Sequence, residues 1–580
     1  MITNQIRQGT LRQDVCLPLL FFALISLVMV GPHVLPPTQI TRFGYAPQDS
    51  YIFLWDFWWT KQAVLALKNP YWTDLLFYPS GTTLTFHTYP LAYGLFSLPF
   101  QLIAKGTAGL VVAFNTVIFL SFVLSGFGAY RLAVYLTGST PAGLLAGLMY
   151  AFIPFHLINM VSLNLLAMEF LPFFVLALLR LKEKPTFPAA LTAAVWLALT
   201  YYSSLEYALF LLLFSGICLI YLTACLRREI TWSFVGFLGV ALALFAILAS
   251  PQLYQQIRVY FAPEFNAEMG LDQAALWSPA LLSLFTPTRF HPIYGQAMSF
   301  AGDLSSHARD SVGMRSEATL GFVTWGLAIL GFLRAREDKS VFWVFAGICF
   351  IGLTLGPYLR VTGKWLSGIP MPYLLLHQLL PPLRASRDPT RFIPLVALSL
   401  SVLAAFGARR CLAYLDRSFS RMLLTVLLGS LILFEYLPGG ALKSKPSMHP
   451  AYREISQHDG DFAVMDLTRE PFGLVQQIFH GKKITSFPKT IPRSPSHRST
   501  LALERDFRSP EKFLNLEPAI RSERLELHKS EIDIFRIRYA VLSPSPKLEL
   551  QMKLAALLGA RMEHVHGLVR CEFMGDRLNY

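Results

Sequence analysis

The sequence has few charged residues. Asp, Glu, Lys and Arg make up 15% of its 580 residues, whereas hydrophobic residues make up 54% and the mean hydropathy is +0.45. Soluble globular proteins carry about 25% charged residues, so the composition excludes an ordinary soluble domain and indicates a protein with many membrane-spanning segments. The net charge of +14 does not indicate a nucleic-acid partner, because Lys and Arg lie mostly in short clusters between apolar runs, without a basic stripe of base-stacking aromatic residues.

Cysteine is also scarce, and its spacing excludes two classes of site. The six cysteines show neither C-x-x-C nor Cys/His metal spacing, so we expect no disulfide framework and no zinc site. All but the last lie in or beside apolar runs: Cys16, Cys218, Cys225, Cys349, Cys411 and Cys571. The segment after residue 440 also lacks a nucleotide-binding Gly-rich loop, a nucleophile elbow and a metalloprotease signature.

Long apolar runs are abundant. A helix of about 17 to 25 apolar residues can cross a bilayer. The first run, Val15 to Pro37, follows Arg7 and Arg12, is longer than a signal-peptide core and lacks a small-residue cleavage site, so we interpret it as an uncleaved span. Uncharged runs of sufficient length are 17–36, 109–130, 142–158, 187–205, 207–226, 233–250, 341–357 and 392–408, and weaker ones are 163–179, 318–333 and 422–438. The sequence therefore predicts an all-α polytopic membrane domain with about eleven spans.

The basic residues predict the orientation of these spans. With the N-terminus in the cytoplasm, every loop on the cytoplasmic side carries net positive charge, provided that Leu91 to Ile103 does not cross. We therefore interpret Leu91 to Ile103 as a juxtamembrane helix. Residues 37–108, 251–316 and 358–391 and the C-terminal tail are then expected on the outer face of a multi-pass protein of the plasma (inner) membrane.

The tail differs in character from the rest of the chain. Charged residues return after about residue 440, and alternating runs at Asp461 to Leu467, Ile537 to Leu542 and Val565 to Phe573 predict strands. Met552 to Ala560 is predicted to form a helix. We therefore predict a membrane domain of residues 1–439, with a first outer loop at 37–108, and a small extracytoplasmic α/β domain of residues 440–580.

The first outer loop holds an aromatic and acidic stretch from Tyr45 to Pro90. Asp49 precedes a helix-like run, Ser50 to Lys68, whose aromatic face and length suit a helix on a membrane surface. An Asp at the start of a helix is most often an N-cap. Alternatively, partial desolvation by the aromatic residues could shift the pKa of this carboxylate towards a value that suits a general base. Asp56 lies on the same helix face about 10 Å further along, and we expect it to support the site without forming part of it.

Several short motifs are spread over the chain. In the first loop they are Asp49 with Trp55, Tyr78-Pro79-x-Gly81 and His87-Thr88-Tyr89; later ones are Ser162 to Leu165 with Leu171-Pro172, Leu355 to Pro357, and Leu383 to Phe392. Together these motifs resemble the GT-C class of integral-membrane glycosyltransferases, and in particular its prokaryotic multi-span members. Each motif is short, and only the ensemble is specific.

This resemblance implies transfer of a sugar from a polyprenyl-phosphate or polyprenyl-diphosphate donor to an acceptor on the outer face. Asp49 would be the catalytic base, and a direct attack would invert the sugar in a hexosyl or pentosyl transfer. The acceptor, whether protein, lipid or glycan, stays open. Many relatives have two adjacent acidic residues where this chain has Gln48-Asp49, and a divalent ion needs several oxygen ligands, so we predict no metal. The carboxylates that would have to complete a Mg²⁺ or Mn²⁺ site are Glu169, Glu206, Asp303 or Asp310.

Three arginines just before the run at 392–408 are candidates to bind the donor phosphate. Arg384, Arg387 and Arg391 lie in the segment R-A-S-R-D-P-T-R-F. A departing lipid phosphate needs fixed positive charge, and Arg can bind it with two donors at once. The alternative is that these arginines bind lipid headgroups or pair with Asp388.

The other candidate contacts follow from the loop motifs and from one acidic residue within an apolar run. They are His87 and Lys105 for the donor phosphate, and Tyr89, Trp55, Trp58 and Glu169 for the acceptor or the sugar. Each has a structural alternative: a lone His is more often a packing or hydrogen-bonding residue, Trp is common in interfacial belts, and an intramembrane Glu can be structural although such groups are often functional.

Two other classes of function are compatible with many spans. A lipid or sugar transporter or flippase is expected to show internal repeats or broken helices at the midplane, and the sequence has no clear repeat. A noncatalytic membrane scaffold for cell-surface polymer assembly should tolerate Asp49→Asn, whereas an enzyme that uses this carboxylate should not.

Overall fold

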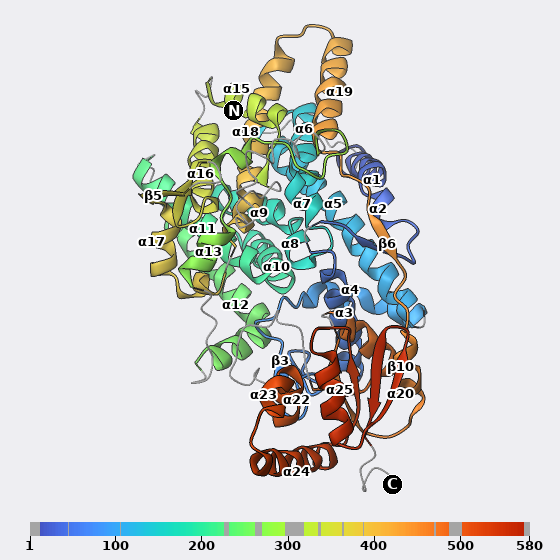
Figure 1. Cartoon of the computed structure of the whole chain (residues 1–580). Coiled ribbons are helices and arrows are strands. Elements are labelled where there is room, and N and C mark those ends of the chain that lie inside the picture. Colours follow the sequence, from blue (N-terminus) through green and yellow to red (C-terminus); the bar gives the residue numbers. More distant parts are fainter. Residues whose placement is uncertain are drawn as a thin grey trace. The chain divides into compact units, whose positions relative to one another are not determined.

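The computed structural model of the chain describes residues 12–44, 46–104, 106–225, 231–261, 270–295, 318–333, 338–361, 365–386, 388–468, 471–485 and 501–573. These residues are mostly helical (Figure 1). The chain divides into two compact units. The first, here called the helical unit, comprises Met1–Pro47, Asn115–Ser250 and Glu268–Lys443; the second, the mixed unit, comprises Gln48–Phe114, Pro251–Ala267 and Ser444–Tyr580.

The apolar runs form helices, since only a helix satisfies its own backbone hydrogen bonds along one apolar segment. The α-helices of the helical unit are α1 (Leu17–Met29), α2 (Gly31–Val34), α6 (Thr140–Ala151), α7 (Pro154–Ile158), α8 (Leu163–Leu166), α9 (Phe170–Glu183), α10 (Phe187–Ser203), α11 (Leu205–Ile220), α13 (Leu271–Trp277), α15 (Phe322–Leu333), α16 (Asp338–Thr354), α17 (Pro372–Leu379), α18 (Ile393–Ala413) and α19 (Ser418–Glu435). Two long helices, α5 (Thr107–Thr137) and α12 (Trp232–Tyr260), contain residues of both units.

Shorter elements connect these helices. They are the π-helices η1 (Arg12–Cys16) and η2 (Tyr221–Cys225), the 3-10 helices η3 (Leu281–Leu284), η6 (Pro381–Ala385) and η7 (Pro389–Phe392), and the strands β1 (Ile40–Arg42), β4 (Tyr358–Arg360), β5 (Trp365–Pro370) and β6 (Leu442–Ser444). Strands β4 and β5 pair with each other in antiparallel orientation.

Among the described residues, six helices are long and apolar enough to cross a membrane. By length and composition they are Thr107–Thr137, Leu163–Glu183, Leu205–Thr223, Trp232–Tyr260, Pro389–Ala413 and Ser418–Glu435. The predicted run 142–158 is divided between α6 and α7, because Pro154 cannot donate to the hydrogen-bond ladder of α6 and instead begins a new helix. The larger count of about eleven spans stays a prediction.

The helix α18 is the core of the helical unit. Within its span, 94% of the most apolar window is buried, and it packs against α6, α15 and α16. Glycine permits the closest of these approaches: a Cβ atom on Gly331 of α15 would lie 2.2 Å from the carbonyl oxygen of Leu403, and one on Gly407 would lie 2.0 Å from that of Leu327. Small residues of this kind let two helix backbones come into contact.

The mixed unit combines the first loop with the tail. Its helices are α3 (Asp49–Leu65), α4 (Leu91–Ile103), α20 (Arg453–Gln457), α21 (Phe472–His480), α22 (Ala502–Arg508), α23 (Pro510–Leu514), α24 (Pro518–Ile534) and α25 (Leu548–Leu557), with the 3-10 helix η8 (Pro450–Tyr452). Its strands are β2 (Trp72–Thr73), β3 (Thr82–Thr83), β7 (Ala463–Leu467), β8 (Lys483–Ile484), β9 (Ile537–Leu542), β10 (Arg561–Val565) and β11 (Leu568–Glu572). The sequence did not indicate that residues 48–114 group with the tail, and the predicted division at residue 440 stays a prediction.

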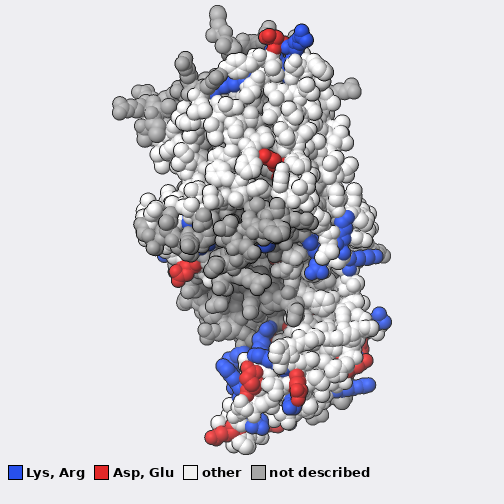
Figure 2. Space-filling model, turned by 45° about the horizontal axis from the view of Figure 1, so that its top comes forward, with Lys and Arg blue, Asp and Glu red and all other residues white. Residues whose placement is uncertain are grey.

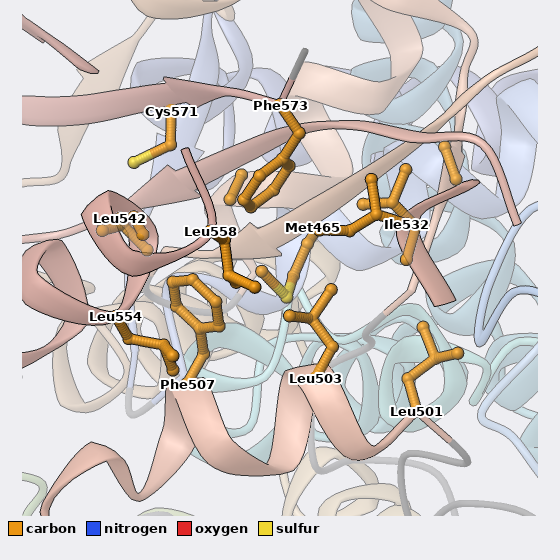
Figure 3. Close-up of a cluster of buried hydrophobic side chains, with 14 of the residues drawn as sticks. Met465, Leu501, Leu503, Phe507, Ile532, Leu542, Leu554, Leu558, Cys571 and Phe573 are labelled. Atoms are coloured by element: carbon orange, nitrogen blue, oxygen red, sulfur yellow. The ribbon is translucent and has the colours of Figure 1, made fainter. Parts of the chain in front are cut away.

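Five strands of the tail form one mixed sheet in the order β10-β11-β9-β7-β8. Strand β7 is parallel to β8 and β9, whereas β11 is antiparallel to β9 and β10. The predicted strands at 461–467, 537–542 and 565–573 are confirmed as β7, β9 and β11, and the helix predicted at 552–560 is α25, four residues earlier at its start. Apolar side chains of the sheet and of α22, α24 and α25 form a buried core, which includes Met465, Phe507, Ile532, Leu554 and Phe573 (Figure 3).

The surfaces of the two units differ in charge. Figure 2 shows wide areas over the helical unit without Lys, Arg, Asp or Glu, whereas both signs of charge are mixed over the tail at the bottom of the view. The helices α12 and α19 account for much of the apolar surface, because only 17% and 11% of their most apolar windows are buried. Exposed apolar helix faces are stable in lipid, which suits α12 and α19 to a membrane.

Candidate functional site

Asp49 is the first residue of α3 and is partly exposed. The N-cap position is occupied by Gln48, whose side chain makes no capping hydrogen bond, so Asp49 lies one residue inside the predicted capping position. The carboxylate in the first turn is stabilised by the helix dipole, because unsatisfied N–H groups give that end a partial positive charge. The helix predicted at 50–68 is confirmed, with an end three residues earlier at Leu65.

The middle of α3 carries a buried pair of titratable groups. Asp56 is 1% exposed, and its Oδ1 lies 3.6 Å from the Nε2 of His87. Burial raises the pKa of the Asp56 carboxyl, and the charge and hydrogen bonding of His87 lower it in part. Since His87 faces Asp56 in the interior, the geometry favours the packing and hydrogen-bonding alternative for this histidine. Its predicted phosphate contact stays a prediction.

Tyr89 also faces the interior of the mixed unit. The hydroxyl of Thr60 donates to the carbonyl oxygen of Asp56 at 2.7 Å, so the hydroxyl of Tyr89, 2.7 Å from Thr60 Oγ1, is left to donate to Thr60. Burial raises the pKa of Tyr89, which keeps the phenol protonated as this role requires. The loop that contains His87 and Tyr89 is thereby held against α3.

The tryptophans of α3 differ in what they can contact. Trp55 is fully buried, and its Nε1–H donates to Gln477 Oε1 at 2.8 Å. Trp59 stacks on Trp55 at a centroid distance of 6.2 Å and donates to the carbonyl oxygen of Pro70 at 2.9 Å. Trp58 is partly exposed. Of the two tryptophans predicted to contact the acceptor or the sugar, Trp58 is therefore the more accessible, and the buried Trp55 contacts protein.

The arginine segment belongs to the helical unit and is described separately. Arg384, in η6, donates from Nε to the carbonyl oxygen of His377 at 3.2 Å and from Nη2 to that of Gln378 at 3.0 Å. These carbonyls end α17, where a cation is favourable. Arg391, in η7, forms an ion pair with Glu206, and both side chains are mostly buried. Arg387 and Lys105 lie outside the described residues.

Asp388, the expected alternative partner of the arginines, caps the helix that contains Arg391. The carboxylate of Asp388 caps η7 by accepting from the backbone N–H of Thr390 at 3.1 Å. Glu206 is the carboxylate in contact with Arg391, which the sequence did not indicate because the two residues are 185 positions apart.

Glu169 lies in a buried polar group that the sequence predicted only in part. Glu169 is 2% exposed, and Ser121 Oγ donates to its Oε2 at 2.7 Å. The Nε2 of His156 lies 3.2 Å from Ser121 Oγ, and its Nδ1 lies 2.7 Å from the carbonyl oxygen of Ala151. Sequence reasoning missed Ser121 and His156, although a histidine within an apolar run is itself a signal.

One group of side chains in the described part of the chain has metal-like spacing. The ligand atoms of Glu454, His458 and Glu572 lie within 4.8 Å of one another. Arginines already neutralise both carboxylates, however: Arg570 pairs with Glu454, and Arg538 pairs with Glu572 at 3.1 Å. A divalent cation would have to compete with these guanidinium groups, so the group does not fit a metal.

Two of the other carboxylates considered for a Mg²⁺ or Mn²⁺ site have protein partners. Glu206 pairs with Arg391, and Glu169 accepts from Ser121. Asp303 and Asp310 lie outside the described residues. No step of the proposed chemistry depends on a metal.

No protein-family model matches the chain, and no curated protein matches it. Solved structures do match. The archaeal oligosaccharyltransferase AglB from Archaeoglobus fulgidus, in complex with an inhibitory peptide and a dolichol-phosphate, is 10% identical with a TM-score of 0.49, over 97% of this chain and 74% of that one. ArnT from Cupriavidus metallidurans matches in the apo state at 11% identity and a TM-score of 0.48, over 97% of this chain and 98% of that one.

A second structure of ArnT from Cupriavidus metallidurans, bound to undecaprenyl phosphate, matches at 11% identity and a TM-score of 0.47, over 97% of this chain and 99% of that one. With such identities and TM-scores, the function of this chain has to be argued from its own residues. The structural neighbours of the chain are GT-C glycosyltransferases, at low sequence identity.

Proposed function

We propose that the chain is an integral-membrane glycosyltransferase that moves a sugar from a polyprenyl-phosphate-linked donor to an acceptor hydroxyl on the outer face of the membrane. The observation that carries the proposal is the partly exposed carboxylate of Asp49 in the first turn of α3, in a chain with six helices of membrane-spanning length. A lipid-linked donor requires a membrane enzyme, because its long apolar tail stays in the bilayer.

The reaction needs one base and one group of cations. Asp49 accepts the proton of the acceptor hydroxyl, whose oxygen attacks the anomeric carbon of the sugar. The bond between this carbon and the phosphate oxygen breaks, and the polyprenyl phosphate leaves with the bonding electrons. A single displacement of this kind inverts the anomeric centre, and it applies to hexosyl and pentosyl donors alike.

The leaving phosphate gains negative charge, which arginines stabilise better than lysines because they bind with two donors. We assign this role to Arg384 and Arg387, with Arg391 contributing when its ion pair with Glu206 opens. Arg384 supports the assignment because it lies in the same short segment as Arg387 and Arg391 and its guanidinium contacts the carbonyl oxygens that end α17.

Orientation follows from the basic loops. We place the N-terminus in the cytoplasm and residues 37–108 and 440–580 outside the plasma membrane, where the acceptor would be a protein, a lipid or a growing glycan. Four side chains keep their proposed contacts with the donor, the acceptor or the sugar: His87, Tyr89, Trp58 and Glu169. The first two and Glu169 are buried, so they have to become accessible when the substrates bind. Trp58 is partly exposed and needs the smallest change.

The test is the change Asp49→Asn in the full chain. Introduced into a deletion strain, the variant should restore less than about 1% of the wild-type glycan, because loss of a general base costs roughly 10²- to 10⁴-fold. Mass analysis of cell-surface glycans measures this, with the protein amount matched by immunoblot. The purified variant should still bind a polyprenyl phosphate as the wild type does.

Asp459→Asn is the matched control, since Asp459 is an exposed carboxylate of the same unit. Full restoration of the glycan by Asp49→Asn would refute the proposed function. An equal loss with Asp459→Asn would refute the specific role of Asp49.

A further inference from the structure

A buried amide of the tail contacts the helix that begins with Asp49. Gln477 lies on α21 and is fully buried. Its Oε1 accepts from the indole N–H of Trp55 on α3 at 2.8 Å, and its Nε2 donates to the carbonyl oxygens of Leu75 at 2.8 Å and Lys482 at 3.0 Å. Gln477 and its three partners all belong to the mixed unit, so one side chain joins α3, the following loop and the tail.

The chemistry of these three contacts is specific for glutamine. The indole N–H can only donate, and the two carbonyl oxygens can only accept. A side chain of this length must therefore offer one acceptor and a doubly donating group, which an amide has. A carboxylate would place an oxygen against two carbonyl oxygens, and an apolar side chain would leave a buried N–H without its acceptor.

The loop also joins the edge of the tail sheet. The backbone N–H of Ile484 in β8 donates to the carbonyl oxygen of Leu75 at 2.9 Å, and the N–H of Tyr78 donates to that of Ile484 at 3.0 Å. The ring of Tyr78 packs edge-to-face against Phe535 at a centroid distance of 6.5 Å, and Lys483 Nζ lies 4.9 Å from its centroid. These contacts cover an edge strand that would otherwise expose its backbone.

We propose that Gln477 is a positioning residue for Asp49 and that the tail holds α3 in its working orientation. The inference rests on the proposed function. Trp55 lies six residues after Asp49, about 9 Å along the helix at 1.5 Å per residue, so fixing the indole fixes the direction of the first turn. A general base has to be held to within about 0.5 Å, and an error of about 1 Å costs roughly 10²-fold in rate.

Two motif residues of the first loop gain a role from this proposal. Trp55 and Tyr78 dock the loop onto the tail, and neither has to touch the sugar. The tail is therefore a required part of the enzyme, on the same side of the membrane as the first loop.

Hydrogen exchange of the full chain in detergent tests the positioning role. Gln477→Leu should speed amide exchange about 5- to 30-fold in α3 and at residues 75–78, because buried hydrogen bonds of about 1–2 kcal/mol in total are lost. Exchange in α25, which packs in the tail core, should not change. Unchanged exchange in α3 would overturn the proposal.

The neighbouring residue provides a matched control. Gln476 is equally buried, but its amide contacts only the tail: Nε2 donates to the carbonyl oxygen of Ser447 at 3.2 Å, and Oε1 accepts from the N–H of His449 at 2.8 Å. Gln476→Leu should speed exchange near residues 447–449 and leave α3 protected. Equal deprotection of α3 by both variants would reduce Gln477 to a general stabilising residue and overturn its positioning role.

Activity provides the second measurement. At matched protein amounts, Gln477→Leu should lower glycan yield about 10-fold or more, whereas Gln476→Leu should keep it within about twofold of the wild type. If Gln477→Leu frees α3 but leaves the yield unchanged, the positioning role is refuted. The proposed function fails separately, through an active Asp49→Asn variant.

A labelling experiment tests the shared side of the membrane without any assay of activity. Single cysteines at the exposed Lys68 and Glu549, in a chain whose six native cysteines are replaced by serine, should both react with a membrane-impermeant maleimide from the same side. Reaction from opposite sides would overturn the docking of the first loop on the tail.

Discussion

Replacing His87 with leucine would leave the carboxyl group of Asp56 buried without the imidazole that faces it. The two groups face each other at 3.6 Å, with side chains that are 0% and 1% exposed. Leucine is close to histidine in size, so the change removes the titratable ring without opening a large cavity. The loss has an upper limit of about 3–5 kcal/mol, the cost of leaving a buried charge uncompensated, because the carboxyl can take up a proton instead.

The pH dependence of this loss has a definite sign. Burial raises the pKa of Asp56 and His87 lowers it, so in His87→Leu the pKa of Asp56 rises further. A carboxyl whose pKa is higher in the folded chain than its unfolded value of about 3.9 binds more protons when folded, and stability therefore falls as the pH rises from that value through the folded pKa. The loss of stability should be largest at neutral pH and should shrink in acid.

Thermal unfolding of the purified full chain in detergent, measured from about pH 4.5 to pH 8, follows this loss. The double variant Asp56→Asn/His87→Leu is the control, because it has no buried carboxyl and should lose the added pH dependence. The reasoning is refuted if His87→Leu is as stable as the wild type at neutral pH, or if the double variant shows the same added pH dependence.

The remaining predictions concern the helical unit. Gly331→Ala should destabilise the chain by about 1–3 kcal/mol, since its Cβ would lie 2.2 Å from a carbonyl oxygen of α18. Gly326→Ala on the same helix, with no atom within 4 Å of its Cβ, should be neutral or stabilise the chain by up to about 1 kcal/mol. Thermal unfolding compares the two variants, and equal effects would contradict the packing described. Arg391→Ala should lower the free energy of unfolding by about 3–5 kcal/mol, because it leaves Glu206 mostly buried and unpaired. Arg384→Ala should lower it by about 1 kcal/mol or less and should mainly lower the affinity for a polyprenyl phosphate, measured by ligand-induced stabilisation. A reversed order of stability would contradict the ion pair.

Local patterns in the sequence predicted the elements that depend on local forces. The apolar runs are helices, the helix at Leu91–Ile103 has the predicted bounds, and the alternating runs of the tail are strands β7, β9 and β11. Hydropathy and alternation report which face of a segment is apolar, and that property needs only neighbouring residues. The division of run 142–158 was predictable in principle, since Pro154 is visible in the sequence.

The sequence also indicated which residues of the first loop are unusual, but not what they contact. Trp55 and Tyr78 were noted as motif residues, whereas their contacts with Gln477 and Phe535 became visible only in the folded chain. Trp55 and Gln477 are 422 positions apart. No periodicity of a helix or a strand extends over such a distance, so the pairing depends on how the loop packs on the tail.

By itself, the sequence determined a chain with span-length apolar helices, a helix with acidic and aromatic residues near its start, and a tail of strands and helices. The tertiary structure decided the partners: Glu206 for Arg391, His87 for Asp56, and the tail for the first loop. Secondary structure follows from hydrogen bonds and apolar faces within one segment, whereas the partner of a buried charge or amide is chosen by the folded backbone, which brings together groups that are distant in the chain.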